Sequence, residues 1–358
     1  MTCVHRLSAI TMLLVLLSGG FGPSTAMAKG ITSAELSAQA DLVDFGDVPA
    51  SLLLAVTEAD GTVTFATKGE HPDGTTATPE DAYRVGSITK IFTAVLVLSL
   101  VEEGKVDLDA SAATYIARVP IPENITVRQL LNHTSGLPNY LDAPAYYEEQ
   151  MADPKRVWTP EDDIALIADL PVAEPGSAFM YANTNYIYLG VLIEEVTGST
   201  YDAVLSERIL EPLKLEHTWL DGFQTGTAPV EAWTYLDDGY GAMTLPYTAT
   251  ATATWAAGGL VSTAADLHMF MTALFAGEIV TPESLTEMTA LPTGEYGMGL
   301  MPFGETAGEW GHIGSMPGYS TFLAHSTVTG RTLFLALTND AIDVSPVLPG
   351  LLERLNQP

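Results

Sequence analysis

Cysteine is almost absent from this sequence of 358 residues, because the only one is Cys3. Thiol catalysis, thiolate metal sites and a disulfide framework are therefore excluded for the rest of the chain, which must be held together by its hydrophobic core. Histidines are scattered without the spacing of metal ligands, and the H-E-x-x-H, P-loop and G-x-S-x-G motifs are missing. We expect neither a metal nor a cofactor.

Positively charged residues are also scarce: 14 Lys and Arg stand against 44 Asp and Glu, a formal net charge of −30. A chain without a positive field does not neutralise nucleic acid phosphates or dock electrostatically on an anionic membrane. This acidic excess is typical of proteins adapted to salt, where screening relieves self-repulsion; an ordinary surface that drifted acidic is the alternative. A melting temperature that rises with added NaCl would favour adaptation to salt.

Long hydrophobic runs are missing except near the start of the chain. Arg6 precedes an apolar stretch from Leu7 to Leu17, and Ala26-Met27-Ala28 fits the small-x-small cleavage rule. The stretch is too short for a spanning helix of about 20 residues. We therefore predict a signal peptide over residues 1–28, with an uncleaved anchor as the alternative. The protein would then be secreted or periplasmic, with no stable membrane anchor.

The remaining chain predicts strands at both ends and helices between them. Two hairpins are expected, one around Asp60-Gly61 and one around Thr329-Gly330, because β-rich runs flank these turn residues. Helical patterns or caps cover six segments: 32–44, 87–103, 126–132, 160–168, 185–197 and 263–275. A further helix is expected over 346–355. The fold class is thus α/β (α+β), an antiparallel sheet flanked by helices plus a mostly helical subdomain.

One catalytic domain over 29–358 accounts for this pattern, since no repeat or low-complexity linker divides the chain. The sheet subdomain would comprise about 29–84 and 256–358, and the helical subdomain about 85–255.

Ser87 and Lys90 are the first candidate catalytic pair. On a helix, residues three apart share one face. A serine hydroxyl is a poor nucleophile until a neighbour takes its proton, and a buried amine near a helix N-terminus has a lowered pKa suited to this. The alternative is a surface lysine near a helix start. A surface position fits poorly, because Lys90 precedes the most apolar helix pattern in the chain, where an unpaired charge is costly.

Two further segments supply polar groups in order along the chain. In Tyr181-Ala182-Asn183, a phenol beside an ammonium relays protons, and an amide orients a lysine or a substrate carbonyl. In His312-Ile313-Gly314-Ser315, glycine allows close backbone approach, and the Ser315 N–H joins that of Ser87 to bind an oxyanion. Taken singly, Tyr181 reads as a core tyrosine and His312 as a strand-end histidine.

Together these motifs resemble the serine β-lactamase and penicillin-binding protein superfamily, which carries S-x-x-K, Y-x-N and K-T-G or H-x-G. The resemblance extends over most of the chain, through residues 125–138, 258–263 and 296–300. His312 in place of lysine resembles the D-alanyl-D-alanine carboxypeptidase branch.

The resemblance implies a β-lactamase/transpeptidase-like fold and acyl-enzyme chemistry on Ser87. Lys90 and Tyr181 would share the proton transfers, with the division between them left open. Substrate would be bound by Asn183, His312, Gly314 and Ser315, and the oxyanion hole would be the backbone N–H groups of Ser87 and Ser315. Within the 125–138 segment, His133 and Arg128 are interpreted as loop scaffolding, and Trp255, just before the glycine pair, as either cleft lining or core.

The substrate is expected to be a small molecule or peptide: a D-amino-acid peptide, a β-lactam or an ester. D-alanyl-D-alanine carboxypeptidase-like activity is our leading expectation. However, no Lys or Arg occurs between Lys214 and Arg331, a stretch in which carboxypeptidases of this branch can use an arginine for the substrate carboxylate. This departure favours esterase or D-amino-acid amidase activity. A β-lactamase and a catalytically silent binder of cell-wall peptides are further alternatives.

Overall fold

The computed structural model describes residues 30–357, apart from 227, 237–238, 243–246 and 305–307. The predicted signal peptide lies outside these described residues. Within them, no helix combines the length and the apolar character needed to cross a membrane.

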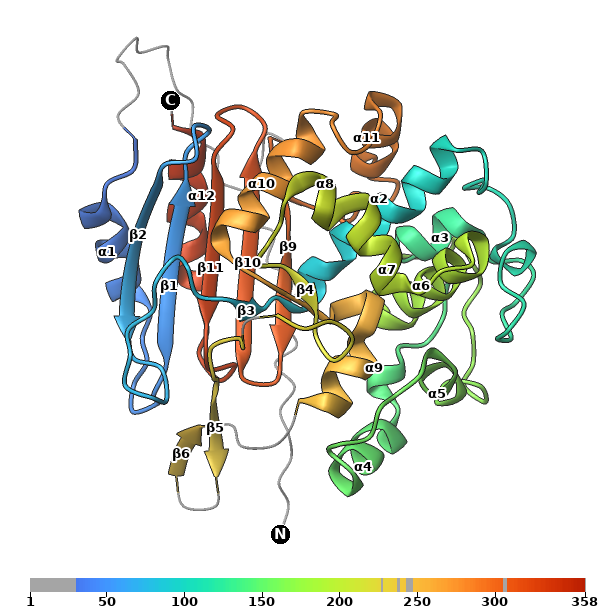
Figure 1. The fold of residues 1–358 in the computed structure, drawn as a ribbon, viewed down its shortest axis with the longest axis horizontal. Helices are drawn as coiled ribbons and strands as arrows, with labels where there is room; N and C mark the ends of the chain where they lie inside the picture. The colour runs from blue at the N-terminus through green and yellow to red at the C-terminus, as the bar shows by residue number, and fades with distance from the viewer. Residues whose placement is uncertain (1–29, 227, 237–238, 243–246, 305–307, 358) are drawn as a thin grey trace.

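A six-stranded antiparallel sheet forms one half of the molecule, on the left of Figure 1. Its strand order is β2-β1-β11-β10-β9-β8, so strands from the two ends of the chain lie side by side. In that order the strands are Val63–Gly69, Ser51–Thr57, Thr332–Leu337, Tyr319–Ser326, Glu309–Met316 and Met301–Phe303. The fold class predicted from the sequence is confirmed.

Both predicted hairpins belong to this sheet. β1 and β2 pair across Asp60-Gly61, where the Asp60 carboxylate accepts the N–H of Thr62 at 2.9 Å and Gly61 has a φ of 85°. β10 and β11 pair across Thr329-Gly330. The central contact joins β1 to β11, with Leu54 opposite Leu335, so the sheet is complete only when both ends of the chain are present.

Different helices cover the two faces of the sheet. One face packs against α1 (Ser33–Leu42) and α12 (Leu348–Asn356) around a compact apolar core that contains Leu54. The other face packs against α10 (Ala264–Phe275), and its core continues without a break into the helical half of the molecule. The sheet is therefore buried on both sides.

Most of the predicted helices form close to their expected bounds. The capping box of Thr32 and Glu35 starts α1, and Gly104 follows the end of α2 (Thr89–Glu102) with a φ of 68°. Five differ by two residues or more at one end: α1 stops at Leu42, α2 starts at Thr89, α5 stops at Ala165, α6 begins early at Asn183, and α12 starts at Leu348. α2 is buried on nearly every side, as predicted from its continuous apolar pattern.

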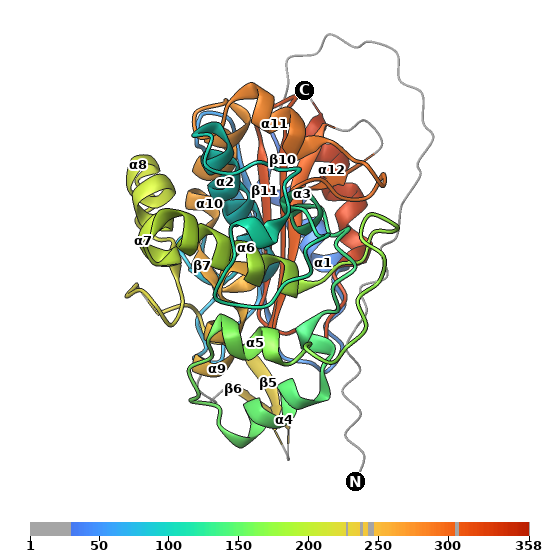
Figure 2. The ribbon, with the colours of Figure 1, turned by 90° about the vertical axis from the view of Figure 1, so that its right-hand side faces the viewer.

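The helical half lies on the right of Figure 1 and faces the viewer in Figure 2. Its elements are α2, α3 (Val127–Leu131), α4 (Pro144–Ala152), α5 (Pro160–Ala165), α6 (Asn183–Thr197), α7 (Tyr201–Leu205), a π-helical turn (Ser206–Leu210), α8 (Glu211–Leu213), α9 (Thr248–Gly258) and α11 (Pro282–Thr289). Shorter strands form a sheet of β3 (Tyr83–Arg84), β7 (Leu260–Ser262) and β4 (Trp219–Leu220), and a ribbon of β5 (Trp233–Leu236) and β6 (Gly239–Ala242).

Candidate active site

Ser87 lies in a 3-10 turn, Gly86–Ile88, between β3 and α2. Gly86 has a φ of 54°, and a Cβ at this position would lie 2.8 Å from the backbone N and O atoms of Ser315. Any other residue would be strained by this backbone conformation and would collide with the sheet. Strand β9 thus packs directly against the turn that carries Ser87.

Lys90 lies on the first turn of α2, and its side chain is completely buried. Its Nζ atom lies 3.0 Å from Ser87 Oγ, 2.7 Å from Asn183 Oδ1 and 2.6 Å from the carbonyl oxygen of Ala257. Burial lowers the pKa of the Lys90 amine well below its usual value, because a charged amine loses its hydration there. This environment favours the neutral amine.

A neutral amine has two hydrogens and one lone pair. The oxygens of Asn183 and Ala257 accept the two hydrogens of Lys90. The lone pair is then left for the hydroxyl of Ser87. The contacts of Lys90 therefore match those of a base positioned to take the serine proton.

Tyr181 stands two residues before α6 and borders Ser87. Its ring centroid lies 5.0 Å from Lys90 Nζ, and its hydroxyl is hydrogen-bonded with that of Ser87. Burial raises the pKa of the phenol, and the bond to Ser87 offsets only part of this rise. The residue is nevertheless 36% exposed, so the ring also borders solvent. A phenol that keeps its proton beside the nucleophile is suited to protonate a leaving group.

Asn183 is the first residue of α6 and links Lys90 to a neighbouring loop. Its Oδ1 accepts a hydrogen bond from Lys90, while its Nδ2 and its backbone N–H both donate to Asn139 Oδ1, at 3.3 and 3.0 Å. The amide is therefore held from both ends, close to Ser87.

His312 lies on β9 and is 2% exposed. Its Nε2 lies 2.9 Å from the Tyr296 hydroxyl and its Nδ1 lies 2.6 Å from the carbonyl oxygen of Ile313. Burial lowers its pKa to about 3, so the ring is neutral. With Nδ1–H donating to Ile313, Nε2 accepts from Tyr296. The ring centroids of His312 and Tyr181 are 6.2 Å apart, so the His312 ring also borders Tyr181.

Gly314 and Ser315 bring the backbone of β9 next to the 3-10 turn that carries Ser87. A Cβ on Gly314 would lie 2.0 Å from the carbonyl oxygen of Val85 and 2.2 Å from Thr321 Oγ1, so no larger residue fits there. Ser315 is exposed, and its backbone contacts Gly86, the residue before Ser87. The two N–H groups assigned to the oxyanion hole thus come from segments in direct contact.

His133, interpreted from the sequence as loop scaffolding, in fact contacts Tyr181. Its ring centroid lies 4.3 Å from that of Tyr181, and its Nδ1 accepts the backbone N–H of Ala182 at 3.3 Å and the Asn185 amide at 2.9 Å. Its own carbonyl accepts the N–H of Met180 at 2.8 Å. His133 thus holds the residues on both sides of Tyr181. The signal that pointed to it was its place in the 125–138 motif.

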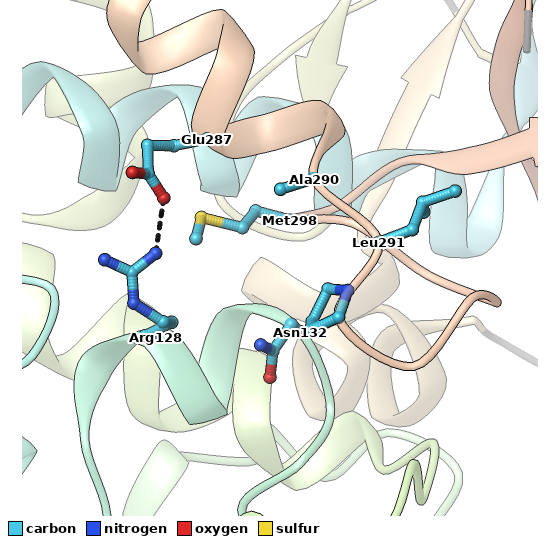
Figure 3. Close-up of a pocket in the computed structure, with 7 residues that line it drawn as sticks. Arg128, Asn132, Glu287, Ala290, Leu291 and Met298 are labelled. Atoms are coloured by element: carbon cyan, nitrogen blue, oxygen red, sulfur yellow. Dashed lines mark hydrogen bonds and ion pairs between the residues drawn. The ribbon is translucent and has the colours of Figure 1, made fainter.

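Trp255 and Arg128 lie outside this cluster. Trp255 is 3% exposed and packs edge-to-face on Tyr201. Of the two interpretations made from the sequence, it is therefore a core residue. Arg128 lines a cavity of about 290 Å³ between α3 and α11, where it is ion-paired with Glu287 (Figure 3). Among the described residues, no group of three or more His, Cys, Asp and Glu side chains is arranged to hold a metal ion.

Solved structures similar to this chain include hydrolases of D-configured substrates. A D-stereospecific amidohydrolase from Streptomyces sp. is 30% identical with a TM-score of 0.74, and the alignment covers 89% of this chain and 96% of that one. The D-amino acid amidase from Ochrobactrum anthropi SV3, complexed with L-phenylalanine, is 26% identical with a TM-score of 0.73, over 90% and 95% of the two chains.

Among curated proteins, the putative penicillin-binding protein PbpX of Bacillus subtilis is 28% identical over 73% of this chain. The chain spans 63% of the length of that relative. The family model described as beta-lactamase matches residues 45–347, which include every residue of the cluster around Ser87. The chain therefore belongs to the beta-lactamase family of serine hydrolases and penicillin-binding proteins.

Proposed function

We propose that this protein hydrolyses amides and esters of D-amino acids through an acyl-enzyme on Ser87. The observation that carries the proposal is the set of contacts of Lys90, whose lone pair is left for Ser87 by two carbonyl acceptors. In this mechanism Lys90 takes the proton of Ser87 as Oγ attacks the substrate carbonyl. Tyr181 then protonates the leaving group, and the same groups activate water for deacylation.

The developing oxyanion is assigned to the backbone N–H groups of Ser87 and Ser315. The contact between Gly86 and Ser315 supports this assignment, because it holds the two segments at a fixed separation. Preorganised donors of this kind contribute on the order of 10²–10³-fold to the rate of acyl transfer.

A neutral leaving group is favoured by the charges around the site. Every arginine among the described residues is ion-paired, including Arg84, which lies three residues before Ser87 and bonds Asp221 at 2.8 Å. Among the described residues, Lys90 is the only basic side chain hydrogen-bonded to Ser87, and its buried amine is neutral in this mechanism and already engaged. A terminal carboxylate, as in a D-alanyl-D-alanine peptide or a penicillin, would thus have no free counter-charge.

The net charge of −30 supports the same substrate class. A strongly negative protein attracts cations and repels anions. A D-amino acid amide carries a free ammonium group, whereas penicillins and carboxypeptidase substrates carry a carboxylate. The relatives described as D-stereospecific amidohydrolase and D-amino acid amidase add support from similarity. Export through residues 1–28 is part of the proposal.

The test is a panel of substrates at equal concentration: D- and L-phenylalanine amide, p-nitrophenyl acetate, a D-alanyl-D-alanine peptide and benzylpenicillin. We expect the D-amide to be hydrolysed well above the L-amide and the peptide, with Ser87→Ala as the inactive control. Hydrolysis of the peptide alone would restore the carboxypeptidase assignment. Intact mass after benzylpenicillin distinguishes a lasting adduct on Ser87 from rapid turnover by a β-lactamase.

A further inference from the structure

Asn139 lies on the side of Asn183 away from Lys90, in the loop before the 3-10 turn Tyr140–Asp142. Its Oδ1 accepts two hydrogen bonds from Asn183, from the backbone N–H at 3.0 Å and from Nδ2 at 3.3 Å. Because two donors converge on this atom, it must be the amide oxygen. Asn139 occupies the N-cap position of the 3-10 turn, yet its side chain does not cap that turn. Its amide is used for Asn183 instead.

The orientation of the Asn183 amide decides what Lys90 can do. With Nδ2 bound to Asn139, Oδ1 faces Lys90 and accepts one of its hydrogens. If the amide flipped, an N–H donor would face Lys90 and would compete with Ser87 for the lone pair of the amine. Only one of the two orientations therefore leaves the base free for the nucleophile.

We infer that Asn139 is a positioning residue, which fixes the Asn183 amide so that Lys90 remains available to Ser87 and thereby sets the pH range of acylation. The inference rests on the proposed function, in which Lys90 accepts the Ser87 proton. Asn139 acts through Asn183 alone, since its oxygen has no other described partner.

The surroundings of Lys90 explain why a charge at position 139 would matter. The titratable groups that face Lys90 are the phenols of Tyr181 and Tyr186, with Nζ 5.0 and 5.5 Å from their ring centroids, and the neutral imidazoles of His133 and His312. α9 contributes only the Ala257 carbonyl. A carboxylate at position 139 would add a negative charge behind Asn183 and stabilise the protonated amine.

Three variants of the full chain separate these effects. Asn139→Leu removes the acceptor at similar volume. Asn139→Asp keeps the acceptor and adds the charge. Asn124→Asp adds the same charge on an exposed turn and serves as the control. The readout is the rate at which a fluorophosphonate probe labels Ser87 across about pH 5 to 10, followed by intact mass. In that reaction the Oγ–P bond forms, fluoride leaves, and the serine proton passes to Lys90.

We expect Asn139→Leu to label about 10- to 100-fold more slowly, by analogy with the loss of an outer residue that orients a metal ligand. Asn139→Asp should label at close to the wild-type rate at high pH. The acidic limb of its pH–rate profile should shift to higher pH by about one pH unit, because Lys90 then holds its proton more tightly. Asn124→Asp should match the wild type. Unfolding temperatures show whether each variant folds. If Asn139→Leu does not fold, the pH profile of Asn139→Asp alone tests the inference.

Wild-type labelling of Asn139→Leu, or equal shifts in Asn139→Asp and Asn124→Asp, would overturn the inference. The probe does not depend on D-substrates. If the wild type is labelled on Ser87 but cleaves no D-amide, the proposed substrate fails while the test of Asn139 still stands. Absence of labelling on Ser87 in the wild type would overturn both.

Discussion

The amine of Lys90 lies 2.6 Å from the carbonyl oxygen of Ala257, at the end of a helix that is distorted by a φ of 30° at Trp255. The distortion lies two positions before the carbonyl that Lys90 uses. A charged amine completely buried on α2 would cost several kcal/mol without such partners. The backbone of α9 therefore contributes directly to the state of the base.

Ser87→Ala should abolish hydrolysis, and Tyr181→Phe should lower kcat by about 10²–10⁴-fold, because it loses the proton donor but keeps the ring. Both variants should retain the circular dichroism spectrum of the wild type. The measurement is turnover of the best substrate in the panel. Wild-type activity in Ser87→Ala would disprove the nucleophile assignment.

Lys90 should make stability depend on pH. Its folded pKa lies well below the usual 10.5, so the unfolded chain binds a proton that the folded chain releases. The free energy of unfolding should therefore rise with pH between the folded pKa and about 10.5, by up to about 1.4 kcal/mol per unit. In Lys90→Met this slope should be smaller by up to about 1.4 kcal/mol per pH unit, which corresponds to the release of one proton.

Denaturant unfolding at several pH values measures both slopes. Lys155→Met is the matched control, because Lys155 is exposed. Its slope should equal that of the wild type. If Lys90→Met also kept the wild-type slope, the neutral amine would be disproved.

His133→Leu should lower both activity and stability. The N–H of Ala182 and the amide of Asn185 would lose their buried acceptor, which costs about 1–3 kcal/mol for an unsatisfied group. Tyr181 would lose its support, so kcat should fall more than KM rises. His133→Asn, which keeps an acceptor near the same place, should recover part of the activity. Equal kinetics in the two variants would argue against a positioning role.

Asp163 should destabilise the protein as pH rises. It is 1% exposed on α5, and neither carboxylate oxygen has a hydrogen-bond partner among the described residues. Burial raises its pKa well above 3.8, so the folded chain holds a proton that the unfolded chain releases. The contribution of the Asp163 carboxyl to the free energy of unfolding is fully present below about pH 4 and is lost as pH rises towards the folded pKa.

Asp163→Asn should therefore raise the melting temperature at neutral pH, with a smaller gain near pH 4. Asp162→Asn is the contrasting control. Its carboxylate is partly desolvated, but hydrogen bonds from Thr159 and the charge of Arg156 lower its pKa overall. Its replacement should destabilise at neutral pH. A melting temperature of Asp163→Asn at or below that of the wild type would contradict the prediction.

Much of the fold could be predicted because local patterns and tertiary packing agree. The hairpins at Asp60-Gly61 and Thr329-Gly330 have turn residues suited to their strands. The continuous apolar pattern of α2 corresponds to its burial on nearly all sides. The start of α6 was misplaced because Asn183 resembles a residue outside the helix, whereas its side chain serves Lys90 and Asn139 rather than a cap.

The candidate site was predictable only where a motif marked it. Ser87, Lys90, Tyr181 and His312 stand in recognisable order, and the structure brings them together. Asn139 and Ala257 belong to no such motif. An asparagine in a loop, or a residue that contributes only its backbone carbonyl, has no sequence signature. Their contribution depends on packing between distant segments. Asn139 lies 44 residues from Asn183 in the sequence, and Ala257 lies 167 residues from Lys90.

The pairing of β1 with β11 has a consequence for how the protein is made. Ser51 donates its backbone N–H to Thr338 Oγ1 at 2.9 Å, across 287 residues of chain. During synthesis, β1 has no partner on that side until almost the whole polypeptide has emerged, and β9 with His312 and Ser315 also comes late. Ser87 is thus made long before β9 brings the backbone of Ser315 against its turn, so the proposed site can assemble only after β9 has been synthesised.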